Sequence, residues 1–365
     1  MSVDVRLTGH LGNNLFQYLV GRDLASRSGL AMTCGLDRST PYRLPRMGGP
    51  WTLADLAMNF PNAPLRVPGL SVETPIEAFE VSKQGDWSGQ ILPRQAFEAA
   101  QAGKGIRLKG HFQRFEYVAP AVQQHRDWFE TLVQRSLSVT RTDVLVDVWR
   151  PRDYGLKGWL LPMSYYLDAL AEMPHIGEVF VVGTGIDDEV RAALDRFKPV
   201  YLELSAIERF SFARCFKRCI LSNSTLSWWS ALLSDATEIY APRAVRTNGY
   251  AFTGFGDVDL HMRSSRYVEV PVEHFVSASY IVESHLVGAS LFKDDHSILV
   301  APRDGPSRRL RGHRALALLR ALIHGKQTTL RELAADYGLS TMLLDELEAL
   351  GMVTVQGPDC KSANT

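Results

Sequence analysis

Four small polar residues, Ser222 to Thr225 (SNST), separate the strand-like stretch "CIL" from the helix-like run "LSWWSALL". A helix that begins here would present unpaired N–H groups and the positive end of its dipole, and both favour a bound phosphate. Serine and threonine are also favoured N-cap residues, so a simple helix start explains the same pattern. Ser222, Asn223, Ser224 and Thr225 are therefore predicted to form either an anion site or a cap.

Two arginines in the run "VWRPRDY" could carry a second part of the same chemistry. Arg150 and Arg152 follow a strand-like stretch, and a guanidinium can bind two phosphate oxygens at once. It can also stabilise the negative charge that develops on a leaving diphosphate. An ion pair between Arg150 and Asp153, or another nearby acid, is the alternative, and it would make these residues structural.

Three further polar residues show a weaker pattern. Asp187 and Asp188 in "GTGIDD" could accept hydrogen bonds from a base or ribose, or could simply begin a helix whose dipole favours acids. His10 lies in the glycine-containing turn "GHLGNN", where it could serve acid–base chemistry or only hydrogen-bond within the turn.

These candidates lie on the loops of a regular strand–helix alternation. The stretch 3–9 and the run 15–29, which has apolar residues at helical spacing, predict a strand, a turn and a helix. From residue 143 to residue 242, strand-like and helix-like stretches alternate strictly, which predicts a parallel sheet covered on both faces. Ligands of such sheets bind at the carboxyl ends of the strands. The polar loops "WRPRDY", "GTGIDD" and "SNSTLS" all lie there. Trp228 and Trp229, one turn inside their helix, are expected to pack in the core.

Composition excludes several classes of protein. The chain has 365 residues, 45% apolar and 22% charged, with a formal net charge of zero, so no overall field favours nucleic acid or acidic lipid as the main partner. Four cysteines are too few for a disulfide scaffold, and Cys215 and Cys219 are predicted to pack on one helical face rather than to bind metal. No signal peptide or membrane-spanning stretch is evident, which predicts a cytoplasmic protein and leaves peripheral attachment at the inner membrane face open.

The character of the chain changes near residue 303. A basic stretch with Pro and Gly predicts a linker, and three helix-like runs with a short strand predict a winged-helix-like unit. The last of these helices, "STMLLDELEALG", holds three acids and no base, which argues against nucleic acid as its partner. The unit is therefore predicted to bind a protein partner or to mediate self-association.

Four segments together resemble the bacterial α-1,2-fucosyltransferase family and, more distantly, the α-1,6- and protein O-fucosyltransferases. Gly9 to Tyr18 (GHLGNNLFQY) is similar to the family's G-G-L-G-N-Q-M-F-Q-Y, and Gly110 to Gln113 (GHFQ) to its G-Y-F-Q. Val148 to Tyr154 (VWRPRDY) is similar to H-x-R-R-G-D-Y, and Asn223 to Trp229 matches N-S-T-x-S-W-W at every specified position. The resemblance spans roughly residues 1 to 270, and its first and last motifs are specific.

The resemblance implies an α/β fold of the GT-B type, with two Rossmann-like domains facing a cleft. With the tail included, the expected organisation is an acceptor-side domain over 1–135, a GDP-sugar-binding domain over 140–272, a connecting segment over 273–302, and a basic linker with the winged-helix-like domain over 303–365. The reaction it implies is inverting, metal-independent transfer of L-fucose from GDP-fucose to a glycan hydroxyl, in an α-1,2 linkage to a galactose-type acceptor. No cofactor and no metal are expected.

The matched motifs also imply roles for individual residues. Arg150 falls on the arginine that contacts the β-phosphate, Ser224 and Thr225 fall beside the diphosphate, and Asp187 or Asp188 falls near guanine. The catalytic residues are predicted to be Arg150, Asp153 and His10. The substrate-binding residues are predicted to be Gly12, Asn13, Arg152, Asp187, Asp188, Ser222, Asn223, Ser224 and Thr225.

Departures from the motifs leave two alternatives open. Val148 replaces the family's histidine, so the same fold and reaction could use a different nucleotide sugar. Pro151 replaces the second arginine, and Arg152 replaces the glycine two places after Arg150. A degenerate transferase core that acts as a nucleotide-binding regulatory or interaction protein is the second alternative.

Overall fold

The computed structural model describes a defined part of the chain, and all statements below concern that part. It comprises residues 2–7, 11–36, 78–81, 98–99, 101–102, 104–124, 139–246, 249–256, 258–278, 281–284, 286–292, 297–302, 308–311, 328–329, 347–348 and 352–356.

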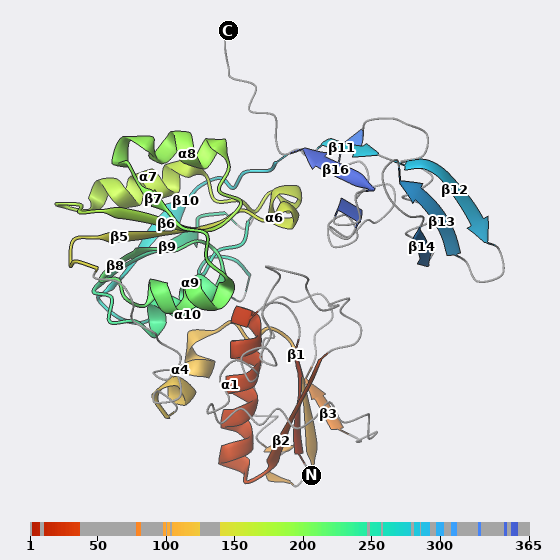
Figure 1. The fold of residues 1–365 in the computed structure, drawn as a ribbon. Helices are drawn as coiled ribbons and strands as arrows, with labels where there is room; N and C mark the ends of the chain where they lie inside the picture. Colours follow the sequence, from red (N-terminus) through yellow and green to blue (C-terminus); the bar gives the residue numbers. More distant parts are fainter. Residues whose placement is uncertain are drawn as a thin grey trace. The chain divides into compact units, whose positions relative to one another are not determined.

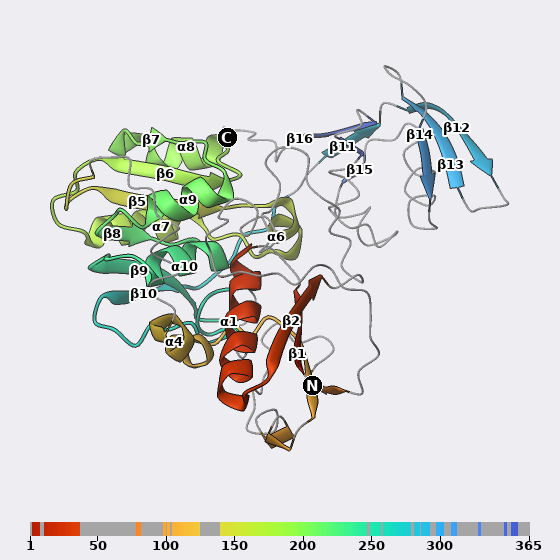
Figure 2. The ribbon, with the colours of Figure 1, turned by 60° about the horizontal axis from the view of Figure 1, so that its bottom comes forward.

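The N-terminal part forms a parallel four-stranded sheet in the order β2-β1-β4-β3. The chain begins with the predicted strand and helix, although the helix starts four residues earlier than its apolar run. Helix α1 packs along the sheet, as both ribbon views show (Figures 1 and 2). The elements are β1 (Ser2–Leu7), α1 (Leu11–Ser28), β2 (Ala31–Leu36), β3 (Ala78–Val81), β4 (Gly105–Lys109) and α4 (Phe115–Gln124).

The second sheet has six parallel strands in the order β10-β9-β8-β5-β6-β7. The predicted alternation is confirmed here, and helices α7 and α8 cover one face while α9 and α10 cover the other (Figure 1). The strands are β5 (Val144–Trp149), β6 (Val179–Thr184), β7 (Val200–Tyr201), β8 (Arg218–Ile220), β9 (Glu238–Ala244) and β10 (Tyr267–Val272). The helices are α7 (Met163–Glu172), α8 (Asp188–Leu194), α9 (Ala206–Ala213) and α10 (Thr225–Leu232).

This strand order is that of a Rossmann-like, doubly wound sheet. Numbered along the chain from β5 as the first strand, the order is 3-2-1-4-5-6, and it reverses between β5 and β8. In open α/β sheets a ligand binds outside the carboxyl ends of the strands on either side of such a reversal. The residues that follow β5 and β8 are therefore the candidates for a ligand-binding site.

Two tryptophans form the centre of the packing between α10 and α1. Trp228 and Trp229 are both 0% exposed, as expected from their place in the helix. The ring of Phe16 in α1 lies 5.1 Å from that of Trp228 and 4.7 Å from that of Trp229. Large buried aromatic side chains of this kind contribute several kcal/mol each to folding.

The described chain divides into two compact units, one of residues 1–149 with 161–274 and the other of residues 150–160 with 275–365. In the second unit, α6 (Arg152–Lys157) is joined to the later segment by a hydrogen bond from Ala278 N to Gly155 O of 3.0 Å and by a bridge between Leu160 and Val276. The predicted grouping of residues 140–272 therefore differs from the observed one at 150–160.

Two small antiparallel sheets follow in the second unit, in the orders β15-β11-β16 and β12-β13-β14. These strands take up parts of the predicted connecting segment over 273–302 and of the predicted basic linker after 303, and the run "SILVAP" pairs with a strand on each side. The strands are β11 (Ile281–Ser284), β12 (Leu286–Phe292), β13 (Ser297–Pro302), β14 (Arg308–Arg311), β15 (Thr328–Thr329) and β16 (Val353–Gln356). The predicted tail helices fall almost wholly outside the described residues, so the winged-helix-like unit stays a prediction.

Within the described residues, no helix combines the length and the apolar character that a membrane crossing requires.

We expect Cys215, in the turn after α9, and Cys219, in β8, to differ in reactivity. Cys219 in β8 is 1% exposed, and burial raises the pKa of its thiol to about 12, whereas Cys215 is half-buried. Because the thiolate is the reactive form, iodoacetamide should label Cys219 only after denaturation and Cys215 more readily. Peptide mass spectrometry of native and denatured protein measures this, and rapid native labelling of Cys219 would contradict its placement in the core.

Candidate functional site

The polar segment after β8 lies at the reversal point of the strand order, and its side chains form hydrogen bonds within the protein. Ser222 Oγ donates to Asp147 Oδ1 of β5 at 2.8 Å and accepts from Ser224 N at 3.3 Å. Ser224 is the N-cap of α10, because its Oγ accepts from Leu226 N at 3.3 Å. The cap explanation of the sequence pattern is therefore confirmed, and contact with a phosphate stays a prediction.

The N-terminal ends of α1 and α10 meet directly at this segment. Thr225 Oγ1 donates to Asn13 Oδ1 at 3.0 Å, and Gln113 Nε2 donates to the same oxygen at 3.0 Å. Trp229 Nε1 donates to Gly12 O at 2.9 Å. Three of the four segments that carry the sequence resemblance are thus brought together by hydrogen bonds between their own residues.

A glycine permits this close approach. A Cβ atom on Gly12 would lie 2.4 Å from Thr225 Oγ1 and 2.5 Å from Leu226 N, which is closer than real Cβ contacts come. The obstacle is partly the backbone of α10, so the clash cannot be relieved by a side-chain rotation alone. Gly12 is therefore the position at which the two helices are held at their short separation.

Asn223 and Tyr250 extend the same polar network. Asn223 is 0% exposed and donates through Nδ2 to Tyr250 O at 3.0 Å. Tyr250 Oη donates to Gln113 Oε1 at 3.1 Å, and burial raises the pKa of Tyr250 above its usual range, so the phenol stays protonated. Sequence reasoning missed Tyr250, because the residue lies outside all four motifs.

The arginines after β5 have different environments. Arg150 directly follows β5 and is 5% exposed. Arg152, two residues later, pairs through Nη2 with Glu348 Oε2 at 2.7 Å, and Asp153 pairs with Lys157 Nζ at 3.1 Å. The structure thus gives Arg152 and Asp153 structural partners in the second unit, while a role for them in catalysis or binding stays a prediction.

The remaining predicted residues divide into described and undescribed ones. Asp187 is the N-cap of α8, because its Oδ1 accepts from Val190 N at 3.0 Å, and Asp188 is the first residue of that helix. Both positions agree with the helix-start alternative, and a contact to a base stays a prediction. His10 lies outside the described residues.

A buried ion pair at the same point was missed by sequence reasoning. Asp147 in β5 is 1% exposed, and its Oδ2 lies 3.8 Å from Nε of Arg209 in α9. Burial raises the pKa of Asp147, while the Arg209 charge and the Ser222 hydrogen bond act in the opposite direction. An acid inside the apolar run "VLVDVW" was the signal that could have revealed it, since a buried carboxylate needs a partner.

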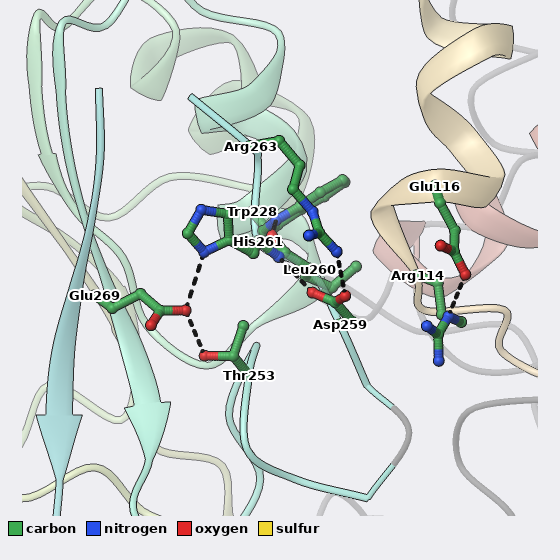
Figure 3. A network of polar contacts seen from close by, with 9 residues as sticks. All are labelled: Arg114, Glu116, Trp228, Thr253, Asp259, Leu260, His261, Arg263 and Glu269. Carbon is green, nitrogen blue, oxygen red and sulfur yellow. Dashed lines mark hydrogen bonds and ion pairs between the residues drawn. The ribbon is translucent and has the colours of Figure 1, made fainter. Parts of the chain in front are cut away.

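A second polar network, shown in Figure 3, fixes the loop between β9 and β10. Glu269 Oε1 lies 3.1 Å from His261 Nδ1 and accepts from Thr253 Oγ1 at 2.9 Å. Trp228 Nε1 donates to Leu260 O at 2.7 Å, which ties the loop to α10. The network connects the core helix to the edge strand, and it contains none of the predicted site residues.

No group of three or more His, Cys, Asp or Glu side chains with the spacing of a metal site occurs among the described residues.

No protein-family model and no curated protein sequence matches this chain. Among solved structures, the fucosyltransferase NodZ from Bradyrhizobium is similar, with a TM-score of 0.33 and 12% sequence identity. The similarity covers 65% of this chain and 92% of the NodZ chain. A similarity at this level does not show a function.

We expect Gly12→Ala to separate α1 from α10. The added methyl group cannot fit against the α10 backbone, so the variant should lose about 1–3 kcal/mol of unfolding free energy, as overpacked cores do. Urea denaturation followed by tryptophan fluorescence measures the loss, because Trp228 and Trp229 lie at this contact. Ser26→Ala on the exposed side of α1 is the control and should change stability by less than about 0.5 kcal/mol. Equal stability of the two variants would contradict the close contact.

Proposed function

We propose that the protein is a glycosyltransferase that moves L-fucose from GDP-fucose to a glycan hydroxyl. The observation that carries the proposal is the position of the NSTLSWW segment, which matches the fucosyltransferase motif and begins at the reversal point of a Rossmann-like sheet. A sheet of this order binds nucleotides at that point. The contact between the first and last motifs at Gly12 and Thr225 supports the resemblance further, since it gives both motifs one shared location.

The proposed chemistry centres on the leaving diphosphate. Cleavage of a sugar–nucleotide bond leaves negative charge on the diphosphate and positive charge on the sugar ring, so groups that stabilise the leaving group lower the barrier. Arg150, at the end of β5, would neutralise the β-phosphate. The N-terminal turn of α10, with Ser224 and Thr225, would offer its amides to the same group. Transfer would proceed with inversion and without a metal ion.

The acceptor would be a glycan or glycoconjugate, with an α-1,2 linkage to galactose as the family pattern implies. His10 or Asp153 would take the proton of its hydroxyl. The C-terminal unit would bind a protein partner or a second copy of the chain. The whole protein would act in the cytoplasm or peripherally at the inner membrane face.

A second candidate function is nucleotide binding without transfer, in a regulatory or interaction protein. The observation that favours it is the number of predicted site residues that have structural roles. Ser222, Ser224, Thr225 and Asp187 all bond within the protein, and these contacts would persist in a core that had lost its chemistry. Measured sugar transfer separates the two candidates, because only the enzyme releases GDP from GDP-fucose.

The identity of the base can be tested by thermal shift. We expect GDP to raise the melting temperature more than UDP, ADP or CDP at equal concentration. A ligand at about one hundred times its Kd adds about 2.7 kcal/mol to the stability of the folded state, which is a shift of several degrees. An equal response to all four nucleotides would contradict a guanine site, and a preference for another nucleotide would support a different donor.

Arg150→Ala should lower kcat by about 100-fold or more while the protein stays folded, because one charged donor to the leaving group is lost. Release of GDP from GDP-fucose in a coupled assay measures the rate, and circular dichroism checks the fold. Arg196→Ala, which removes an exposed arginine near the end of α8, is the matched control and should keep full activity. Normal turnover by a folded Arg150→Ala variant would refute the role of Arg150.

A further inference from the structure

Arg209 is a buried cation at the reversal point of the second sheet. It is the fourth residue of α9, whose N-terminus follows the carboxyl end of β7 and carries a capping box formed by Ser205 and Glu208. Its side chain is 6% exposed and reaches the carboxyl end of β5, where Asp147 and Trp149 point to the same side of the sheet. Arg209 therefore lies beside the loop that starts at Ser222, through the shared contact with Asp147.

The guanidinium of Arg209 is poorly satisfied in this position. Its Nε lies 3.8 Å from Asp147 Oδ2, which is an ion pair but is longer than a hydrogen bond. That buried Nε has no hydrogen-bond partner among the described residues. The guanidinium carbon lies 5.4 Å from the centre of the Trp149 ring, so the aromatic face supports the charge without accepting its N–H groups in a strong bond.

Two other arginines of the same unit donate hydrogen bonds to acceptors within the protein. Arg214, buried at the C-terminal end of α9, donates through Nε to Leu233 O at 3.1 Å. Arg266 donates to three backbone carbonyl oxygens at distances of 2.9 to 3.1 Å. Both are fixed by neutral acceptors in the manner of structural arginines. Among the described residues, Arg209 has a long ion pair with Asp147 and no hydrogen-bond acceptor for its Nε, so a guanidinium with five N–H groups has donors available to a further acceptor.

The electrostatics of the position favour an anionic acceptor. A helix N-terminus carries positive partial charge, so a cation at the end of the first turn is unfavourable unless an anion lies nearby. One carboxylate, Asp147, offsets part of this charge and also accepts a hydrogen bond from Ser222. The N-termini of α9 and α10 both lie at the carboxyl edge of the sheet, where parallel strands deliver ligands. A ligand with two phosphate charges would supply the missing acceptors.

We propose that Arg209 binds the diphosphate of the nucleotide-sugar donor, as a cation additional to Arg150. The proposal rests on the proposed function, because it assigns a residue to the same donor site. In it, the Trp149 ring holds the plane of the guanidinium, and Asp147 keeps the cation in place when the ligand is absent. The phosphate oxygens then accept hydrogen bonds from the guanidinium, including its Nε, for which the described residues supply no acceptor.

The test is calorimetric titration of wild-type protein and Arg209→Met with three probes: GDP, inorganic pyrophosphate and guanosine. Wild type should bind GDP and pyrophosphate. Arg209→Met should bind both at least about 10-fold more weakly, as the loss of a charged hydrogen bond of about 1.4 kcal/mol or more requires, and should bind guanosine as wild type does. Arg214→Met removes a buried arginine from the opposite, C-terminal end of the same helix and should leave all three affinities unchanged.

Removal of Arg209 alone leaves the Asp147 carboxylate buried without its cation, which can destabilise the fold. The double variant Asp147→Asn/Arg209→Met removes both charges, keeps an acceptor for Ser222, and provides a folded protein in which the same loss of diphosphate affinity is expected. Asp147→Asn alone keeps the cation and should retain pyrophosphate binding.

The outcomes separate the two claims. If wild type binds GDP and pyrophosphate and the Arg209 variants bind them with equal affinity, the role of Arg209 is overturned and the proposed function stands. If Arg214→Met loses as much affinity as Arg209→Met, the effect is a general consequence of lost stability and the proposal is overturned. If wild type binds neither probe, the donor site is overturned together with the role of Arg209.

Discussion

The contact between the N-terminal ends of α1 and α10 is the constraint on which the rest of the molecule depends. The hydrogen bond from Thr225 to Asn13 joins residues 212 positions apart in the sequence. It forms only because Gly12 allows the backbone of α10 to come as close as it does. With the Trp229 indole bonded to Gly12 O in the same place, the first sheet and the second sheet are joined through a small number of motif residues. Changes in either motif must therefore preserve this contact before they can preserve any chemistry.

This contact changes what the motif match means. Within NSTLSWW, Asn223 bonds to Tyr250 O, Ser224 caps α10, Thr225 bonds to Asn13, and the two tryptophans bond to Leu260 O and Gly12 O. Each of these letters has a structural reason that holds without any substrate. The motif match in this chain is therefore explained by packing and hydrogen bonding alone. Any chemistry depends on groups whose hydrogen-bonding capacity is not used up within the protein. Groups with hydrogen-bonding capacity in excess of their internal partners are the ones to examine for function, and Arg209 is of this kind.

The sequence predicted the parts of the fold that local patterns control. The alternation of strands and helices over 143–242, the first strand and helix, and the burial of Trp228 and Trp229 all follow from periodicity and position. The strands over 281–311 were not predicted, because short runs interrupted by Gly, Pro and Arg carry little helical or strand signal. Their pairing depends on partners elsewhere in the chain, which a local reading cannot supply.

Prediction of the candidate site from the sequence has the same limit, because local patterns do not show contacts between distant residues. Ser224 and Asp187 were expected either to cap helices or to bind a ligand, and the structure shows that both are caps, which is the alternative that local sequence can decide. Asp147 and Arg209 were missed, because the significance of each depends on the other and they lie on different elements. In the sequence, an acid in an apolar strand and a base in an amphipathic helix show no relation to each other. In the fold, β5 lies beside β8, and Arg209 of α9 reaches Asp147 of β5.

The charge balance at the reversal point explains why such a pair is retained in a buried place. The N-termini of α9 and α10 and the Arg209 guanidinium produce a positive potential at the carboxyl edge of the sheet. Asp147 forms an ion pair with that guanidinium. Without an anion, the site would bear the full desolvation cost of the cation during folding, whereas a closely bonded carboxylate would occupy some of its N–H donors. The 3.8 Å separation between Arg209 and Asp147 lies between these limits. In the role proposed for Arg209, this separation stabilises the charge enough for burial and would leave N–H donors for a diphosphate.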